Sequence, residues 1–332
     1  MCAGATRPKG DVTRRAGIGN RDLDDVIAPN QVVDRYRRGD TVVLQGLHHT
    51  DPALARLANN LALALDQPVQ INAYLSPASS RGLDLHFDYH DVFVVQLAGS
   101  KHWRVWAPLD RTTNPVKGRH TIAPPRLEEL GPPLIDRTVA AGECLYVPRG
   151  FPHAAETVDE ASDHLTIGVT AVTWQRVVRR AVDAEVAAGR MAEPLPVGLL
   201  EPDAAPPDVA VDPEFVHRWV QPATLKHWLA REIWRRQPAT RLRPRLVPEV
   251  GSAPLVVTPG PLLWLTTIAD RAVLGVGDRV LDLPAEALAC LAAVLGAEGA
   301  FDPAELDDGL DEASRRVVLR RLAAEGVLVG AG

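Results

Sequence analysis

The chain has 332 residues, of which 46% are hydrophobic and 23% charged, and its formal net charge is −6. This is the composition of a folded protein, and the length suggests two or three domains. The negative charge argues against a general nucleic-acid coat or a cationic membrane binder. No apolar run reaches the roughly 18 residues that span a bilayer, and residues 1–20 lack a signal-peptide core. The three cysteines are too scattered for a disulfide framework, so we expect a cytoplasmic protein.

Residues 1–20 are polar and rich in Gly and Arg, which predicts a flexible leader. From residue 41 the pattern changes to short β-rich stretches separated by Gly, Pro and Ser, with one helix over 52–66 that carries a stripe of leucines. The expected strands are 41–44, 69–75, 85–97, 101–106, 143–147 and 164–173. Many short strands with little helix between them predict an antiparallel barrel or a double-sheet jelly roll, in an α+β chain.

The second half has helical periodicity. Residues 174–191 and 223–236 are expected helices, joined by a Pro-rich connection over 193–213, so residues 176–250 form a helical region with a linker. The last part, 256–332, is expected to hold helices over 284–295 and 312–324, a helix opening at Asp302-Pro303, and a strand over 326–329. That order is typical of a winged-helix-like module.

The stretch 85–97 carries the candidate chemistry. On a strand, His86 and Asp88 point to the same face, where they offer an imidazole and a carboxylate side by side. A third ligand could come from His153, which follows a buried strand and a tight turn. Two histidines and one carboxylate bind one face of Fe(II) and leave positions open for a co-substrate and oxygen. The pattern therefore predicts a metal site.

Other side chains in this stretch compete for the ligand role. Asp91 lies on the face opposite Asp88, so we expect it to be structural. His90 shares the inward parity but has no carboxylate two positions further on, and His102 is expected to be exposed. The remaining histidines are treated as non-ligands: His48, His49, His120, His164, His217 and His227.

The run 98–101 contains a Gly-Ser pair, which predicts a two-residue type II′ hairpin turn. Ala98 then pairs with Lys101, so even-numbered residues of the first strand share a face with odd-numbered residues of the second. Lys101 is therefore expected to point into the barrel, where an ammonium group needs an anion. Its natural partner is the remote carboxylate of an acid whose other end chelates the metal. A three-residue loop would instead send Lys101 to solvent.

Taken together, these runs resemble the JmjC-type 2-oxoglutarate oxygenases, specifically the cupin-like ribosomal oxygenase branch. The matching runs are 72–77, 86–93, 96–105, 142–153 and 162–166. The resemblance implies a double-stranded β-helix of the jelly-roll, cupin or JmjC type over 21–175. It also implies a dimerisation-like helical region and a winged-helix-like domain after it.

The same resemblance implies that His86, Asp88 and His153 ligate Fe(II), and that Lys101 pairs with the distal carboxylate of 2-oxoglutarate. The implied co-substrate pocket is lined by Lys101, Tyr74, Asn72, Thr166 and Thr170. The implied enzyme is a dioxygenase that consumes O2 and 2-oxoglutarate, releases succinate and CO2, and hydroxylates a protein side chain. A ribosomal protein is the expected substrate.

Three alternatives stay open: an oxygenase of biosynthetic peptides, a non-oxidative cupin-type metalloenzyme, and a catalytically silent scaffold. An inward Lys101 favours the oxygenase, because only a chelating diacid requires it.

Residues 214–245 hold eight basic side chains against two acidic ones, interleaved with tryptophans. This favours a helix pair at a homodimer interface, with an RNA contact as the alternative. Residues 256–326 hold six Arg against twelve acidic residues, so sequence-specific DNA binding is not expected.

Overall fold

The computed structural model describes two compact units of the chain. Residues 1–62 and 69–171 form the first, here called the barrel unit, and residues 63–68 and 172–332 form the second, the C-terminal unit. The described residues are 9–18, 21–80, 82–115, 122–189, 254–258, 263–268, 270–276 and 279–331, with single positions at 214, 217, 220, 221, 225, 228, 229, 232 and 233. Within these residues no helix combines the length and the apolar character that a membrane crossing requires.

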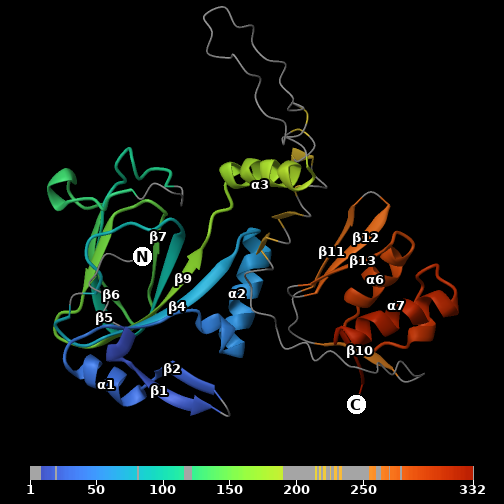
Figure 1. Cartoon of the computed structure of the whole chain (residues 1–332), viewed down its shortest axis with the longest axis horizontal. Coiled ribbons are helices and arrows are strands. Elements are labelled where there is room, and N and C mark those ends of the chain that lie inside the picture. The colour runs from blue at the N-terminus through green and yellow to red at the C-terminus, as the bar shows by residue number, and fades with distance from the viewer. Residues whose placement is uncertain are drawn as a thin grey trace, which may run out of the picture. The chain divides into compact units, whose positions relative to one another are not determined.

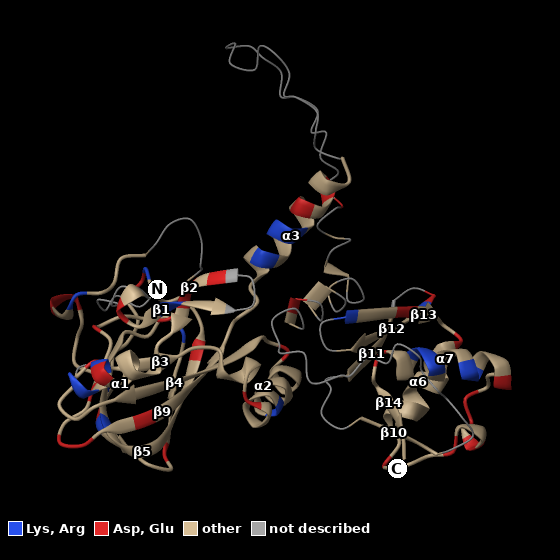
Figure 2. Ribbon diagram, turned by 60° about the horizontal axis from the view of Figure 1, so that its bottom comes forward, with Lys and Arg blue, Asp and Glu red and all other residues tan. Residues whose placement is uncertain are grey.

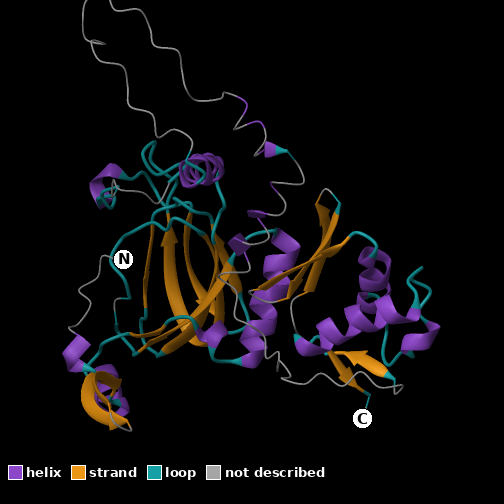
Figure 3. Cartoon of the chain, turned by 45° about the vertical axis from the view of Figure 1, so that its right-hand side comes forward, coloured by secondary structure: helices purple, strands orange, loops and turns teal. Residues whose placement is uncertain are grey.

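The barrel unit is built on a seven-stranded antiparallel arrangement in the order β3-β4-β9-β5-β6, with β7 and β8 also paired to β5 (Figures 1 and 3). The strands are β3 (Val42–Leu44), β4 (Val69–Ser76), β5 (Asp91–Val105), β6 (Ile135–Ala140), β7 (Cys144–Val147), β8 (His153–Glu156) and β9 (Ser162–Val169). The expected strands at 41–44, 69–75, 143–147 and 164–173 correspond to β3, β4, β7 and β9. The predicted barrel-like double sheet is confirmed, although β6 and β8 were not predicted.

The predicted hairpin at 98–101 is wrong. Instead, β5 continues without a turn for 15 residues, pairing with β7 and β9 along its first part and with β6 and β8 along its second. Its pairing with β9 shifts register between Gln96 and Ala98, which marks a β-bulge, and Gly99 has a φ of 61°. A bulge inserts one extra residue and bends the strand, and Gly tolerates positive φ, so a Gly-Ser pair suits this bend as well as a turn.

The bulge nevertheless changes the parity of the strand as the hairpin would have done. The buried positions switch from even to odd across it: Val92, Val94 and Gln96 before, and Lys101, Trp103 and Val105 after. Lys101 is therefore buried, as expected, but a β-bulge and not a hairpin turn directs it inward.

The expected strand over 85–97 begins only at Asp91. Before it, His86 forms a single isolated bridge with His153, and the rest of 85–90 is irregular. The reason is long-range: this segment bonds to a loop distant in sequence and has no continuous ladder. His86 and Asp88 are thus held by loop contacts and not by strand alternation.

One expectation near the N-terminus is corrected. Residues 13–18, within the expected flexible leader, form β1 (Thr13–Ile18), which pairs with β2 (Arg21–Ile27) ahead of α1 (Pro29–Arg37). The sequence of this hairpin is polar because charged side chains form ion pairs between its strands, as in the 2.7 Å pair of Arg15 with Asp22.

The helix α2 (Pro52–Leu65) is present, but its leucine stripe is not its buried face. Its buried residues are Ala55, Ala58, Asn59 and Ala62. Small side chains allow a helix to approach its neighbours closely, and this packing overrides the leucine periodicity.

The C-terminal unit begins with α3 (Trp174–Ala187). The described elements that follow are β10 (Leu255–Val257), β11 (Leu263–Ile268), β12 (Arg271–Val276), β13 (Arg279–Pro284), α6 (Ala287–Leu295), α7 (Glu312–Ala324) and β14 (Leu328–Gly330). The antiparallel sheet β11-β12-β13 was not predicted, and β10 pairs with β14. The helix expected at Asp302-Pro303 is only a 3-10 turn over Pro303–Glu305, although Asp302 does cap it.

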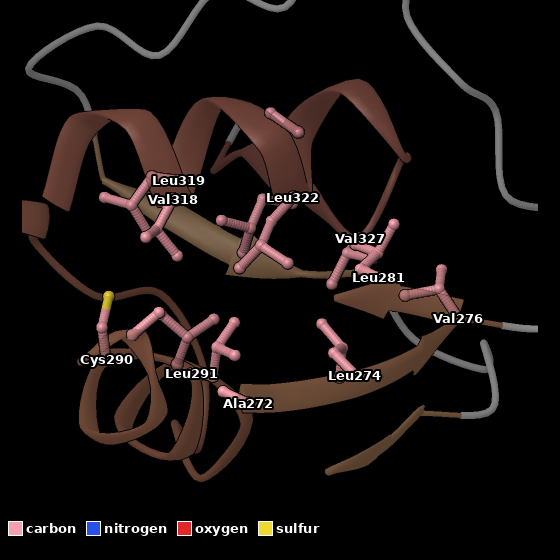
Figure 4. Packing of buried hydrophobic residues seen from close by; sticks show 14 of the residues in the cluster. Ala272, Leu274, Val276, Leu281, Cys290, Leu291, Val318, Leu319, Leu322 and Val327 are labelled. Carbon is pink, nitrogen blue, oxygen red and sulfur yellow. The ribbon is translucent and has the colours of Figure 1, made fainter. Parts of the chain in front are cut away.

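The core of this end lies between α6, α7 and the strands (Figure 4). Leu291 of α6, Leu322 of α7 and Leu274 of β12 are fully buried and point toward one another. Figure 2 shows basic side chains along α7 and acidic ones in the segments beside it, as in the bidentate pair of Arg315 with Asp308. The winged-helix likeness stays a prediction. The connection over 193–213 and most of the basic, Trp-rich segment lie outside the described residues.

Candidate metal and co-substrate site

The structure brings together the three predicted ligands. His86, Asp88 and His153 each offer one donor atom, and these atoms all lie within 4.8 Å of one another. His153 Nε2 is 3.6 Å from Asp88 Oδ2, and the centres of the two imidazole rings are 4.3 Å apart. The cluster joins an irregular segment to the first residue of β8, far apart in the sequence.

Main-chain hydrogen bonds hold these two segments in register. His153 N donates to His86 O at 2.8 Å, and His86 N donates back to His153 O at 3.2 Å. Gly150 N donates to Asp88 O at 2.9 Å. Gly150 has a φ of 82°, and a Cβ there would lie 2.0 Å from Thr112 O, so this turn requires glycine.

Both histidines present the nitrogen that a metal needs. His86 Nδ1 lies 2.7 Å from Asp84 O, and His153 Nδ1 lies 2.9 Å from Phe151 O. Because a carbonyl oxygen only accepts, each Nδ1 carries the proton, and the Nε2 lone pair is left for a metal. Burial, and then the neighbouring His86, lower the pKa of His153 to about 4. His153 is therefore neutral at pH 7, which is the metal-binding form.

Lys101 is 2% exposed, and its Nζ donates to Ser76 Oγ at 2.9 Å. Among the residues that the structure describes, no carboxylate pairs with this ammonium group. Burial lowers the pKa of Lys101 to about 8, so the group is still mostly charged at pH 7. A buried cation without a counter-ion is unfavourable, which makes this position a site for an anionic ligand.

The other expected pocket residues lie on β4 and β9, which pair with each other. Tyr74 is opposite His164 and stacks on it, with ring centres 5.0 Å apart. Asn72 is opposite Thr166, and its side-chain oxygen accepts from Gly46 N at 2.9 Å. Asn72, Tyr74 and Ser76 follow one another at intervals of two residues along β4, so their side chains lie on the same face of the sheet. Thr170 is half-buried and lies one residue beyond the end of β9.

Several polar residues of this inner face were not predicted to belong to the site. Ser76 bonds Lys101, and Gln96 Nε2 donates to Ser162 Oγ at 2.8 Å. His164, treated as a non-ligand, does not join the metal cluster, but burial and then Lys101 lower its pKa to about 3. His164 is two positions before Thr166 on the same strand, and this spacing could have indicated that both side chains point inward.

Three buried polar atoms on this face have no hydrogen-bond partner within the described part of the chain: Gln96 Oε1, Trp103 Nε1 and His164 Nδ1. Buried polar atoms are normally satisfied, so a polar ligand or water is needed here. Together with Lys101, they fit a barrel that holds a polar, anionic small molecule.

The competing residues lie around the cluster and not in it. His90 packs on Gly168 and lies 3.4 Å from the amide of Gln70. The side chain of His102 is 28% exposed and bonds Asp136 at 2.7 Å. Asp91 bonds the hydroxyl of Tyr146.

This fold and site define a class of protein. Residues 45–177 match the JmjC domain family model, and the barrel is a JmjC domain of the cupin type.

Particular relatives are similar to this domain. Ribosomal oxygenase 1 of Gallus gallus is 41% identical over 97 residues, which are 29% of this chain and 16% of that protein. The bifunctional lysine-specific demethylase and histidyl-hydroxylase NO66 of Dictyostelium discoideum is 34% identical over 140 residues, 42% of this chain and 27% of that protein. The matched segments thus span about a quarter or less of these curated relatives.

Solved structures share the fold over more of the chain. YcfD, a ribosomal oxygenase from Escherichia coli in complex with cobalt and succinic acid, superposes with a TM-score of 0.56 at 19% identity, covering 97% of this chain and 87% of that one. The same protein in complex with cobalt and 2-oxoglutarate gives a TM-score of 0.53 at 20% identity, with coverages of 88% and 78%.

Proposed function

We propose that this chain is an Fe(II)- and 2-oxoglutarate-dependent dioxygenase that hydroxylates a side chain of a ribosomal protein. The observation that carries the proposal is the combination, inside one barrel, of a two-histidine, one-carboxylate cluster and a buried ammonium group that has no counter-ion among the described residues. A chelating diacid connects the two, because one end binds the metal and the other needs a cation. The ribosomal oxygenases among the relatives, and the complex of YcfD with cobalt and 2-oxoglutarate, agree with this function.

The residues divide the work between them. Fe(II) held by His86, Asp88 and His153 would supply the coupled oxidation in which O2, 2-oxoglutarate and a substrate C–H give succinate, CO2 and a C–OH. Lys101, oriented by Ser76, binds the distal carboxylate of 2-oxoglutarate. The stacked rings of Tyr74 and His164, with the pocket residues Asn72, Thr166 and Thr170, form the polar inner face around it.

A turnover assay tests this function. Protein loaded with Fe(II) is incubated with carboxyl-labelled 2-oxoglutarate and total ribosomal protein, beside a His86→Ala control. We expect labelled CO2, succinate, and a gain of one oxygen mass on one ribosomal protein. Turnover no higher than the control would favour a non-oxidative cupin or a silent scaffold. Turnover that only a biosynthetic peptide stimulates would contradict the ribosomal substrate.

We also propose a homodimer through the helical region 176–250, and a winged-helix-like domain over 256–332. The support for the dimer is α3, whose side chains at Trp174, Val178 and Val186 are 65%, 40% and 57% exposed and lie at multiples of four residues. Sedimentation of wild type and Trp174→Glu tests it, since a monomeric wild type would contradict the dimer.

A cytoplasmic location is supported by the unpaired cysteines Cys144 and Cys290.

A further inference from the structure

The two segments that supply the metal cluster are also connected by a side chain outside it. Asp91 Oδ1 accepts a hydrogen bond from Arg149 N at 3.2 Å and another from the hydroxyl of Tyr146 at 2.8 Å. Asp91 begins β5, directly after the segment with His86 and Asp88, whereas Arg149 lies in the loop that leads to His153. The carboxylate therefore connects the two ligand-bearing segments from outside the cluster.

The contact falls at the turn of that loop. The consecutive amides of Arg149 and Gly150 donate to Asp91 Oδ1 and to Asp88 O, respectively. Gly150 is at positive φ, and the chain enters β8 at His153 three residues later. Where this turn is held decides where the imidazole of His153 lies.

The Asp91 carboxylate does not itself reach the cluster. Val92 and Val147 are buried, whereas their neighbours Asp91 and Tyr146 face the other side of the sheet. Asp91 is therefore not a ligand, and its hydrogen bond to Arg149 N connects it to the cluster through the main chain of the loop.

We propose that Asp91 is a positioning residue for the metal centre, which holds the 148–152 loop so that His153 meets His86 and Asp88. The inference rests on the metal site of the proposed function. Without the carboxylate, the amide of Arg149 loses its acceptor and the loop samples more conformations. Ordering those conformations on metal binding then costs affinity.

Co(II) titration of the full-length, metal-free chain, followed by visible absorption, tests the proposal. We expect Asp91→Ala to bind Co(II) about 10-fold more weakly than wild type, the loss typical of removing a supporting contact. Asp91→Asn keeps an acceptor oxygen and should bind within about 3-fold of wild type. The matched control is Asp136→Ala, which removes another carboxylate that accepts a hydrogen bond, from His102, and should leave the affinity unchanged.

Hydrogen exchange on the metal-free proteins gives a second readout. The peptide containing Arg149 should exchange faster in Asp91→Ala than in wild type, and Asp91→Asn should restore its protection. Unchanged Co(II) affinity and unchanged exchange in Asp91→Ala would overturn the positioning role, even if the melting temperature falls. A wild type that does not bind Co(II) would instead remove the proposed metal site itself.

Discussion

Lys101 and Ser76 lie on different strands of the barrel, and the ammonium group of the first donates to the hydroxyl of the second at 2.9 Å. Ser76 ends β4, whereas Lys101 lies in the second half of β5, beyond its bulge. The hydroxyl orients the buried cation without neutralising it, which leaves its charge for a ligand. This is the feature that separates a diacid-binding barrel from a metal-binding cupin without one.

Replacing Lys101 by Ala should leave Co(II) binding intact and weaken 2-oxoglutarate binding. Removing one partner of a buried charge pair costs about 2–5 kcal/mol, or roughly 30-fold to several thousand-fold in the dissociation constant. Calorimetry on the Co(II)-loaded protein measures it, with His102→Ala as a neighbouring control. Equal affinity in the Lys101 variant would exclude this residue from the pocket.

Because burial lowers the pKa of Lys101 to about 8, the affinity for 2-oxoglutarate should fall as pH rises through that value. Binding needs the ammonium form, so the dissociation constant should rise about tenfold per pH unit above that value. The neighbouring His164, with a pKa of about 3, is neutral throughout this range. Lys101→Arg keeps its charge, so any binding it retains should show no such dependence. A flat wild-type profile between pH 7 and 10 would contradict this prediction.

The lowered pKa of Lys101 should also make the free energy of unfolding rise with pH, whereas the affinity for 2-oxoglutarate falls. The folded protein binds the Lys101 proton less tightly than the unfolded chain, whose value is near 10.5. This residue therefore lowers the free energy of unfolding below pH 8, and that cost disappears as pH rises toward 10.5. Urea unfolding of wild type and Lys101→Met at pH 7 and 9.5 measures it. The gain from Lys101→Met should be larger at pH 7, and equal gains at both pH values would argue against a depressed pKa.

Gly99→Ala should disrupt the bulge that turns Lys101 inward. A Cβ at Gly99 would lie 1.8 Å from Ala161 O, whereas Gly142 has a similarly positive φ but open space around it. Gly142→Ala should therefore cost only the backbone strain, about 1–2 kcal/mol, and Gly99→Ala about 3 kcal/mol or more. Denaturant unfolding compares the two variants. Similar losses would show that the bulge relaxes around a methyl group.

Leu322→Ala should destabilise the C-terminal unit without affecting the metal site. Leu322 is fully buried in the core of α6, α7 and β12, so the loss should be about 2–5 kcal/mol. Val317, on the same helix, is 69% exposed, and Val317→Ala should change stability by less than about 0.5 kcal/mol. Thermal unfolding measures both variants. A parallel loss of Co(II) affinity in Leu322→Ala would show that the two units are energetically coupled.

Local sequence patterns were sufficient for the features that depend on neighbouring residues. The helix α7 was predicted with its observed bounds, because its periodicity lies within a few turns. The histidine–carboxylate pair and His153 could be chosen by residue type, since few side chains bind Fe(II). The inward direction of Lys101 was also predicted, although from a turn that does not exist.

Only the tertiary structure decided how these pieces meet. Whether residues 98–101 form a turn or a bulge depends on their pairing with β9, which is more than sixty residues further along the sequence. His86 is aligned by bonds to the first residue of β8 and Asp88 by a bond to the loop before it, and Lys101 donates to Ser76 on another strand. Such long-range pairing leaves no local periodicity, because its partners are fixed by the register of distant strands. Composition and spacing therefore determined which side chains could do the chemistry, and the pairing of distant strands determined which of them converge.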